Sequence, residues 1–68
     1  MIPTLTPSQQ TLLRRCDGGL RLWEVGAKRA ALLADLSVLT HLRFVSFDDD
    51  LGYELTAEGE AWLIDASR

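Results

Sequence analysis

The sequence has 68 residues, of which 47 % are hydrophobic, and carries a net charge of −3. This length suits one small domain spanning residues 1–68 and is too short to enclose a substrate pocket of several hundred Å³. The single cysteine, Cys16, excludes an internal disulfide framework and fits a reducing compartment. The start resembles no signal peptide and no apolar stretch is long enough to span a bilayer, so we expect a cytoplasmic protein with no membrane partner.

The charge is divided unevenly along the chain. Residues 1–34 carry five cations and two acids, a balance of +3, whereas residues 35–68 carry two cations and eight acids, a balance of −6. This segregation predicts a weakly basic part and a strongly acidic part of the folded domain. An acidic surface favours a protein partner with a basic surface, such as a protein that handles nucleic acid.

The first predicted helix begins at Thr6-Pro7-Ser8-Gln9, which has the residues of a capping box with proline at the first helical position. Leu12, Leu13 and Cys16 provide its apolar stripe, so Cys16 is expected to be a small buried hydrophobe. The Asp17-Gly18-Gly19 segment ends the helix. Residues 20–25 alternate in hydrophobicity and predict a short strand, which Gly26 interrupts.

A central helix is predicted over residues 27–41, since this segment lacks Gly and Pro and places Leu32, Leu36 and Leu39 at helical spacing. Residues 43–47 are β-branched and aromatic and predict a strand. Residues 48–52 form the turn, in which Gly52 supplies a positive φ, and residues 53–55 return as the partner strand. Thr56 caps the last helix, whose start is acidic and whose packing residues are Ala61, Trp62 and Leu63.

From Ala27 onward the chain resembles bacterial winged helix-turn-helix regulators, and the segment LTPSQQTLLRR resembles their first helix. The matching positions include a Tyr-x-Leu-Thr-x-x-Gly run; they are Leu36, Leu39, Val45, Tyr53, Leu55, Thr56 and Gly59. The resemblance implies an α+β, winged-helix-like domain of three helices with a small antiparallel sheet, made of a short strand and a wing hairpin. It also implies that Gly59 lets the last helix lie close to the wing.

Two positions depart from that family. The family has a short helix before its recognition helix, but only Trp23 to Ala27 are available here, so this helix is expected to be missing or reduced to a turn. Arg43 stands where the family usually has Gly before the strand.

The outward face of the central helix is apolar and small. If the leucines face the core, this face presents Ala30, Ala31, Leu33, Ala34, Ser37 and Val38. Base edges are read by hydrogen-bonding side chains, which this face almost lacks. Asp48, Asp49 and Asp50 in the wing would each meet a repulsion of about 1 kcal/mol at about 4 Å from a phosphate. Both features favour a protein surface over DNA as the partner.

The chain also contains two tryptophans and a few residues of types that can take part in catalysis. Trp23 and Trp62 are both expected in the core, with Trp23 the better candidate for an exposed hot spot. Ser37 and His41 lie one helical turn apart, but nothing nearby orients the histidine as a triad requires, so His41 is expected to be a surface residue. The Asp48-Asp49-Asp50 run lacks the spacing of a calcium loop, and there is no phosphate-binding glycine motif. We therefore expect no enzyme activity, metal or cofactor.

Two hypotheses follow. The first is a non-catalytic protein-binding module. It could be a bacteriophage-type inhibitor that occludes a nucleic-acid-handling protein, or a module that pairs with a second copy of itself. Its contact residues would be Ala30, Ala31, Leu33, Ala34, Val38, Trp23, Asp48, Asp49 and Asp50. The alternative is a dimeric DNA-binding regulator. That regulator would use Arg21, Lys28 and Arg29, with support from Arg14 and Arg15.

Overall fold

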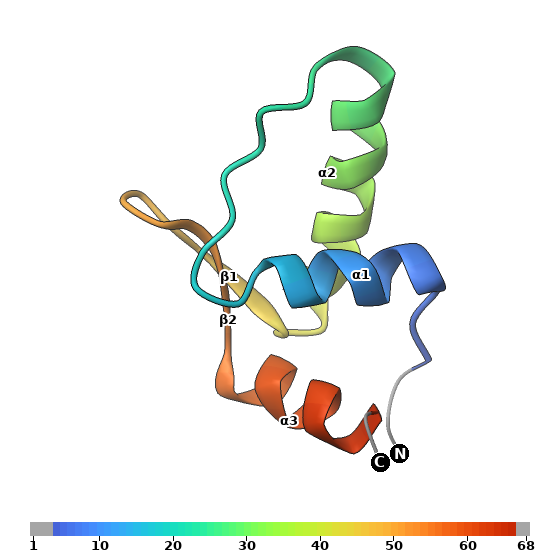
Figure 1. Cartoon of the computed structure of the whole chain (residues 1–68), viewed down its shortest axis with the longest axis vertical. Coiled ribbons are helices and arrows are strands. Elements are labelled where there is room, and N and C mark those ends of the chain that lie inside the picture. The colour runs from blue at the N-terminus through green and yellow to red at the C-terminus, as the bar shows by residue number, and fades with distance from the viewer. Residues whose placement is uncertain (1–3, 67–68) are drawn as a thin grey trace.

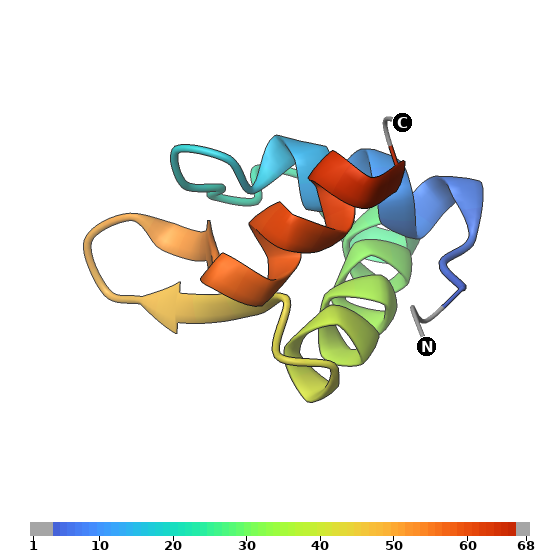
Figure 2. The same ribbon diagram turned by 90° about the horizontal axis from the view of Figure 1, so that it is seen from below.

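The computed structural model describes residues 4–66, which form three helices and one two-stranded antiparallel sheet (Figure 1). The elements in chain order are α1 (Pro7–Arg15), α2 (Gly26–His41), β1 (Val45–Asp48), β2 (Gly52–Leu55) and α3 (Ala57–Ala66). The expected α+β class is confirmed, and the order of elements is consistent with a winged-helix-like topology. The wing, residues 45–55, extends from one side of the helical body (Figure 2).

The predicted start and end of α1 are confirmed. The Thr6 hydroxyl accepts a hydrogen bond from the Gln9 amide at 3.1 Å, and the Gln9 side chain accepts one from the Thr6 amide at 3.0 Å. Pro7 occupies the first turn, where its missing N–H is not needed. After the helix, Gly18 and Gly19 both take positive φ, which glycine adopts without a steric penalty.

The predicted strand over residues 20–25 is wrong. Only Leu20 pairs with the sheet, through two backbone hydrogen bonds with Tyr53 of 2.8 and 2.9 Å. The chain must then travel along α2 to reach the start of that helix, so residues 21–25 leave the sheet as an extended loop (Figure 1). This loop contains no helix, as expected from the short spacing between Trp23 and Ala27.

The predicted central helix is confirmed as α2, but the strand after it starts two residues later than the predicted position 43. Arg43 has a φ of +64°. Its amide donates to the Thr40 carbonyl at 3.0 Å, and the Phe44 amide donates to the Leu39 carbonyl at 2.9 Å. These two bonds make a left-handed helix end of the Schellman type. Arg43 therefore has a left-handed backbone conformation that glycine adopts more readily, and β1 begins at Val45.

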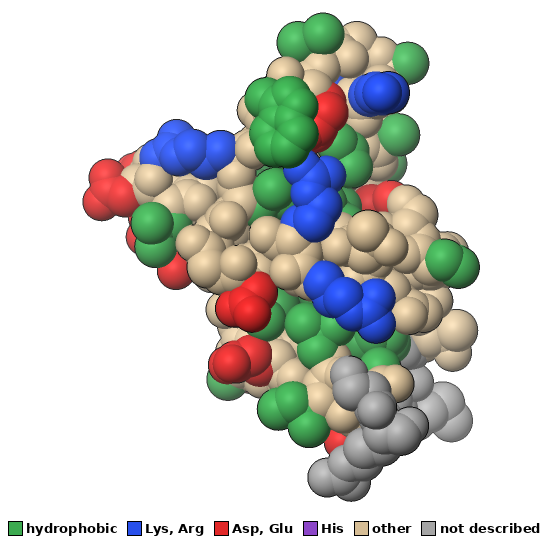
Figure 3. Space-filling model, viewed as in Figure 1, with side chains coloured by type: hydrophobic (Ala, Val, Ile, Leu, Met, Phe, Trp, Pro, Cys, Tyr) green, Lys and Arg blue, Asp and Glu red, His purple; other side chains and the backbone are tan. Residues whose placement is uncertain are grey.

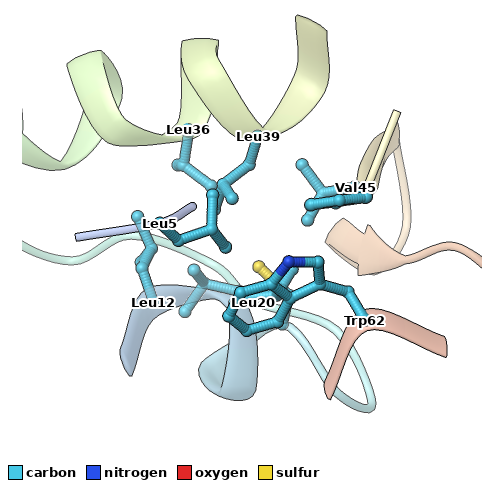
Figure 4. Close-up of a cluster of buried hydrophobic side chains, with 10 residues drawn as sticks. Leu5, Leu12, Leu20, Leu36, Leu39, Val45 and Trp62 are labelled. Carbon is cyan, nitrogen blue, oxygen red and sulfur yellow. The ribbon is translucent and has the colours of Figure 1, made fainter. Parts of the chain in front are cut away.

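The core lies where α1, the second half of α2, α3 and the base of the wing meet (Figure 4). Its buried side chains are Leu5, Leu12, Leu13, Cys16, Leu20, Leu36, Leu39, Phe44, Val45 and Trp62. Trp62 reaches into this cluster from α3, and Leu36 and Leu39 reach into it from α2 (Figure 4). Leu32 is half-buried against the cluster, so the predicted inward face of α2 is confirmed.

The junction between the wing and α3 has the geometry expected from its sequence. The Thr56 hydroxyl accepts from the Gly59 amide at 3.1 Å and donates to the Arg43 carbonyl at 2.6 Å. A Cβ atom on Gly59 would overlap the carbonyl oxygen of Phe44, so only glycine allows this close approach.

Within residues 4–66, no helix is both long enough and apolar enough to cross a membrane.

Candidate functional site

The outward face of α2 is exposed. All six positions predicted to point outward are exposed, and the two largest, Leu33 and Val38, retain 38 % and 41 % of their accessible surface. The opposite face holds the core leucines, so α2 separates a buried side from a solvent side. The solvent side is apolar and has no large charged group at its centre. The centres of protein contact surfaces have this composition.

Trp23 lies in the loop before α2 and is 77 % exposed, whereas Trp62 is buried. The expectation that both tryptophans belong to the core is therefore wrong for Trp23, because the loop carries it away from the sheet. The Arg15 guanidinium carbon lies 5.1 Å from the centre of the Trp23 ring, and Arg15 pairs with Glu24 at 3.4 Å. One face of the ring thus has a cationic neighbour, an arrangement that orients the side chain.

Val25 was missed by the sequence analysis. It is the last residue of the predicted strand and is 80 % exposed at the N-terminal end of α2, where no side chain caps the helix. A β-branched residue directly before a glycine and a helix was the available signal. We use the name apolar surface for the exposed set of Trp23, Val25, Ala30, Ala31, Leu33, Ala34 and Val38.

Two hollows border the loop before α2. The larger, of about 470 Å³, lies beside Trp23 and is lined by Arg15, Trp23, Glu24, Lys28, Ala31 and Leu32. The smaller, of about 190 Å³, lies between the loop, α2 and the wing and is lined by Leu20, Arg21, Leu22, Arg29, Leu33, Phe47, Gly52 and Tyr53. Residues of the apolar surface line both hollows: Trp23 and Ala31 line the larger one, and Leu33 lines the smaller one.

The three wing aspartates have different roles. The Asp48 carboxylate accepts hydrogen bonds from the amides of Leu51 and Asp50 at 3.0 and 2.7 Å. These two bonds lower the pKa of Asp48 and occupy its carboxylate in the turn. Asp49 and Asp50 are exposed, and their backbone carbonyls accept from the Arg21 guanidinium. Asp49 and Asp50 are thus the more exposed of the three wing aspartates.

Two exposed apolar side chains of the wing were also missed. Phe47 is 64 % exposed, with its ring 5.2 Å from that of Tyr53, and Leu51 is 48 % exposed at the turn. A leucine inside an aspartate-rich turn was a signal that could have been used. Phe47 lines the smaller hollow together with Leu33, so the wing and the apolar surface share one depression.

The three cations proposed for DNA binding differ in their surroundings. Lys28 and Arg29 are exposed at the first turn of α2 and form no ion pair within residues 4–66. Arg21 is held against the wing tip. Figure 3 shows Lys and Arg side chains interspersed with hydrophobic ones over the first half of α2 and its preceding loop, and acidic side chains at the wing tip and over α3. The basic and acidic parts expected from the sequence are thus only partly separate, because Arg21 lies beside the acidic wing tip.

No group of three or more His, Cys, Asp or Glu side chains in residues 4–66 is placed to hold a metal ion. The Cys16 thiol is fully buried, and burial raises its pKa to about 11, which keeps it protonated and unreactive. Ser37 and His41 are both exposed on α2.

No protein-family model matches the chain, and neither the curated proteins nor the solved structures provided a significant match.

Proposed function

We propose that this domain is a non-catalytic protein-binding module. The observation that supports this most directly is the exposure of the apolar surface, with Trp23 at 77 % and Val25 at 80 %. Soluble monomers seldom leave several neighbouring large apolar side chains in water unless the region binds something. A tryptophan held at the rim of a hollow is the type of residue that contributes most to binding energy.

DNA is the second candidate, and the winged arrangement with Lys28 and Arg29 at the start of α2 is the observation in its favour. Three features weigh against it. The exposed face of α2 has almost no side chain that can hydrogen-bond to a base edge. Arg21 is engaged by the wing tip. Asp49 and Asp50 are exposed where the wing would approach phosphates, and their charges oppose that contact.

The acidic residues of the wing tip and α3 form a second candidate contact region, separate from the apolar surface. A partner with a basic surface would meet them favourably, which fits a protein that handles nucleic acid. An inhibitor of the bacteriophage type, which covers such a partner's binding groove, is one function of this class.

The test compares variants as bait in affinity capture from the native cell. We expect Leu33→Glu to remain folded, because Leu33 is partly in solvent, and to lose the partner, because a charge at the contact is costly to desolvate. Thr11→Glu is the matched control: it adds the same charge at an exposed position on α1 and should retain the partner. A Leu33→Glu variant that captures the same partner as the parent would contradict the proposal.

A titration of labelled random duplex, followed by fluorescence polarisation at low salt, addresses the second candidate. A DNA binder would show micromolar affinity that falls steeply with added salt. Such binding, lost in Lys28→Glu and retained in Leu33→Glu, would replace the protein-binding proposal with the DNA-binding one.

A further inference from the structure

The two ends of the molecule differ in charge. The described chain is elongated, with a longest dimension of 34 Å against 24 and 19 Å for the other two. The N-terminal half of α2 and the loop with Trp23 form one end of the long axis, and α3 lies at the other end (Figure 1). Each end carries exposed apolar groups together with charges of one predominant sign.

The first end, which we call the basic end, combines the apolar surface with Lys28 and Arg29. Both cations are exposed and form no ion pair within the described residues. Arg15 lines the larger hollow beside Trp23. Glu24 is the acid of this hollow, and it already pairs with Arg15 at 3.4 Å. The exposed balance at this end is therefore positive.

The opposite end, which we call the acidic end, is the outer face of α3. Gly59 and Trp62 face the core, so helical geometry places Glu60 and Ile64 on the solvent side, with Ala57 and Ala61 beside them. Ile64 is 60 % exposed. Glu58 and Asp65 are exposed on the same helix, which carries no Lys or Arg among its described residues. This end thus offers an apolar side chain surrounded by carboxylates.

We propose that the basic end of one molecule binds the acidic end of a second copy, so that the chain associates head to tail. The proposal rests on the proposed function, since it names a second copy as one partner of the apolar surface. Charge complementarity selects this occupant: basic-to-basic or acidic-to-acidic pairing would bring like charges together, whereas head-to-tail contact brings Lys28 and Arg29 to the carboxylates of α3. Ile64 then enters the depressions beside Trp23 or Leu33.

Such a contact joins two different patches, so it is not closed by a two-fold axis. Repetition gives a ring or an open chain of molecules. A specific interface of about 1,000 Å² in total would cover about 500 Å² on each copy, roughly a tenth of the surface of 4705 Å². The small size predicts weak, concentration-dependent association that is screened by salt.

The experiment is sedimentation velocity of the full chain over a range of concentrations, in about 0.1 M and about 1 M NaCl. Expected is a mass that rises with concentration beyond a dimer in the low salt and falls back toward the monomer in the high salt. Arg29→Glu at the basic end and Glu60→Lys at the acidic end should each weaken self-association at least about tenfold, because each places like charges in contact.

Mixing distinguishes head-to-tail binding from other modes. Each variant alone keeps one intact end, and in an equimolar mixture an intact basic end meets an intact acidic end while the reversed charges at positions 29 and 60 also attract each other. The mixture should therefore recover the association that each variant lacks alone. Arg14→Glu and Asp17→Lys are the matched controls: they change the net charge equally at exposed positions away from the two ends. The controls should associate like the parent, both alone and when mixed.

Three results would overturn the inference. They are a monomer at every concentration in low salt, a mass that stops at a dimer in the parent, and a mixture of the two end variants that stays monomeric. These results leave the proposed function standing if Leu33→Glu still loses a captured partner. Conversely, suppose that head-to-tail association persists unchanged in Leu33→Glu. That result would show that charge joins the basic end to the acidic end and that the apolar surface is not part of the contact.

Discussion

The peptide backbone of α3 touches the start of the wing at Gly59 and Phe44, where a single added methyl group on Gly59 would overlap the Phe44 carbonyl oxygen. The same carbonyl accepts a hydrogen bond of 3.0 Å from the Thr56 amide. The backbone of the last helix thus packs directly against the backbone that leads into the wing. This close packing depends on Gly59, which has no side chain.

Gly59→Ala should therefore destabilise the domain strongly. In an exposed helix the change would stabilise by about 1 kcal/mol, but here the methyl group forces α3 away from the wing, and overpacking of this kind costs about 1–3 kcal/mol or more. Urea unfolding followed by circular dichroism measures the difference. Gly18→Ala is the control, because its site is open and only the positive φ of +84° opposes the change. A Gly59→Ala variant more stable than Gly18→Ala would contradict the packing.

Arg43→Gly should stabilise the domain by about 0.5–1 kcal/mol. Arg43 has a φ of +64°, which is strained for a residue with a Cβ atom and free for glycine, and this relief exceeds the entropy that glycine adds to the unfolded chain. Arg43→Ala keeps the Cβ and removes only the charge, so it should give no such gain. Thermal unfolding of the three proteins at equal concentration tests the order; a glycine variant less stable than the alanine variant would be inconsistent with a left-handed helix end.

The two tryptophans should respond oppositely to truncation. Trp62→Ala removes a buried side chain and should cost about 3–5 kcal/mol, while Trp23→Ala should change stability by no more than about 1 kcal/mol, through the lost contact with Arg15. Iodide quenching of fluorescence provides an independent check. The emission of the Trp62→Phe variant, which reports on Trp23, should be strongly quenched, and that of Trp23→Phe only weakly. Equal quenching would show that Trp23 is not in solvent.

Burial of Cys16 predicts a loss of stability in alkali. The unfolded thiol ionises near pH 9 and the folded one at about 11. The contribution of the protonated thiol is present below pH 9 and is lost as the pH rises toward 11, to an extent of about 2–3 kcal/mol. Cys16→Ala should unfold with a smaller decrease of the unfolding free energy over this interval, as measured by urea titration. Parallel pH profiles for the two proteins would mean that the thiol is accessible.

The turn of the wing should be acid-sensitive through Asp48. Its amide partners, Asp50 and Leu51, favour the carboxylate and lower the pKa of Asp48, so the turn is intact at neutral pH and loosens as the pH falls below about 4 and the group becomes protonated. The amide shifts of Asp50 and Leu51 should follow this titration by nuclear magnetic resonance. Asp48→Asn keeps an acceptor oxygen without the charge, so its turn should persist with shifts that no longer follow pH in this range.

Local sequence determined most of the secondary structure, because its signals act over one turn of helix or one tight turn. The capping box of Thr6 and Gln9, the leucine spacing of α2 and the positive φ of Gly52 depend only on neighbouring residues. The exposure of Leu33 and Val38 was predictable for the same reason, since fixing Leu36 in the core determines which way every other residue of one helix points.

Tertiary structure decided the positions that depend on distant partners. Residues 20–25 alternate like a strand, but a strand forms only where its partner continues, and the route to α2 takes the chain away from Tyr53 after Leu20. That same departure places Trp23 in solvent. The pattern of hydrophobicity cannot distinguish an exposed aromatic residue from a buried one, since both count as apolar. The exposure of each side chain is set by which segments the fold brings near it. The separation of the basic end from the acidic end is likewise spatial: the packing of α1, α2 and α3 sets the first half of α2, with Lys28 and Arg29, at one end of the long axis and α3 at the other (Figure 1).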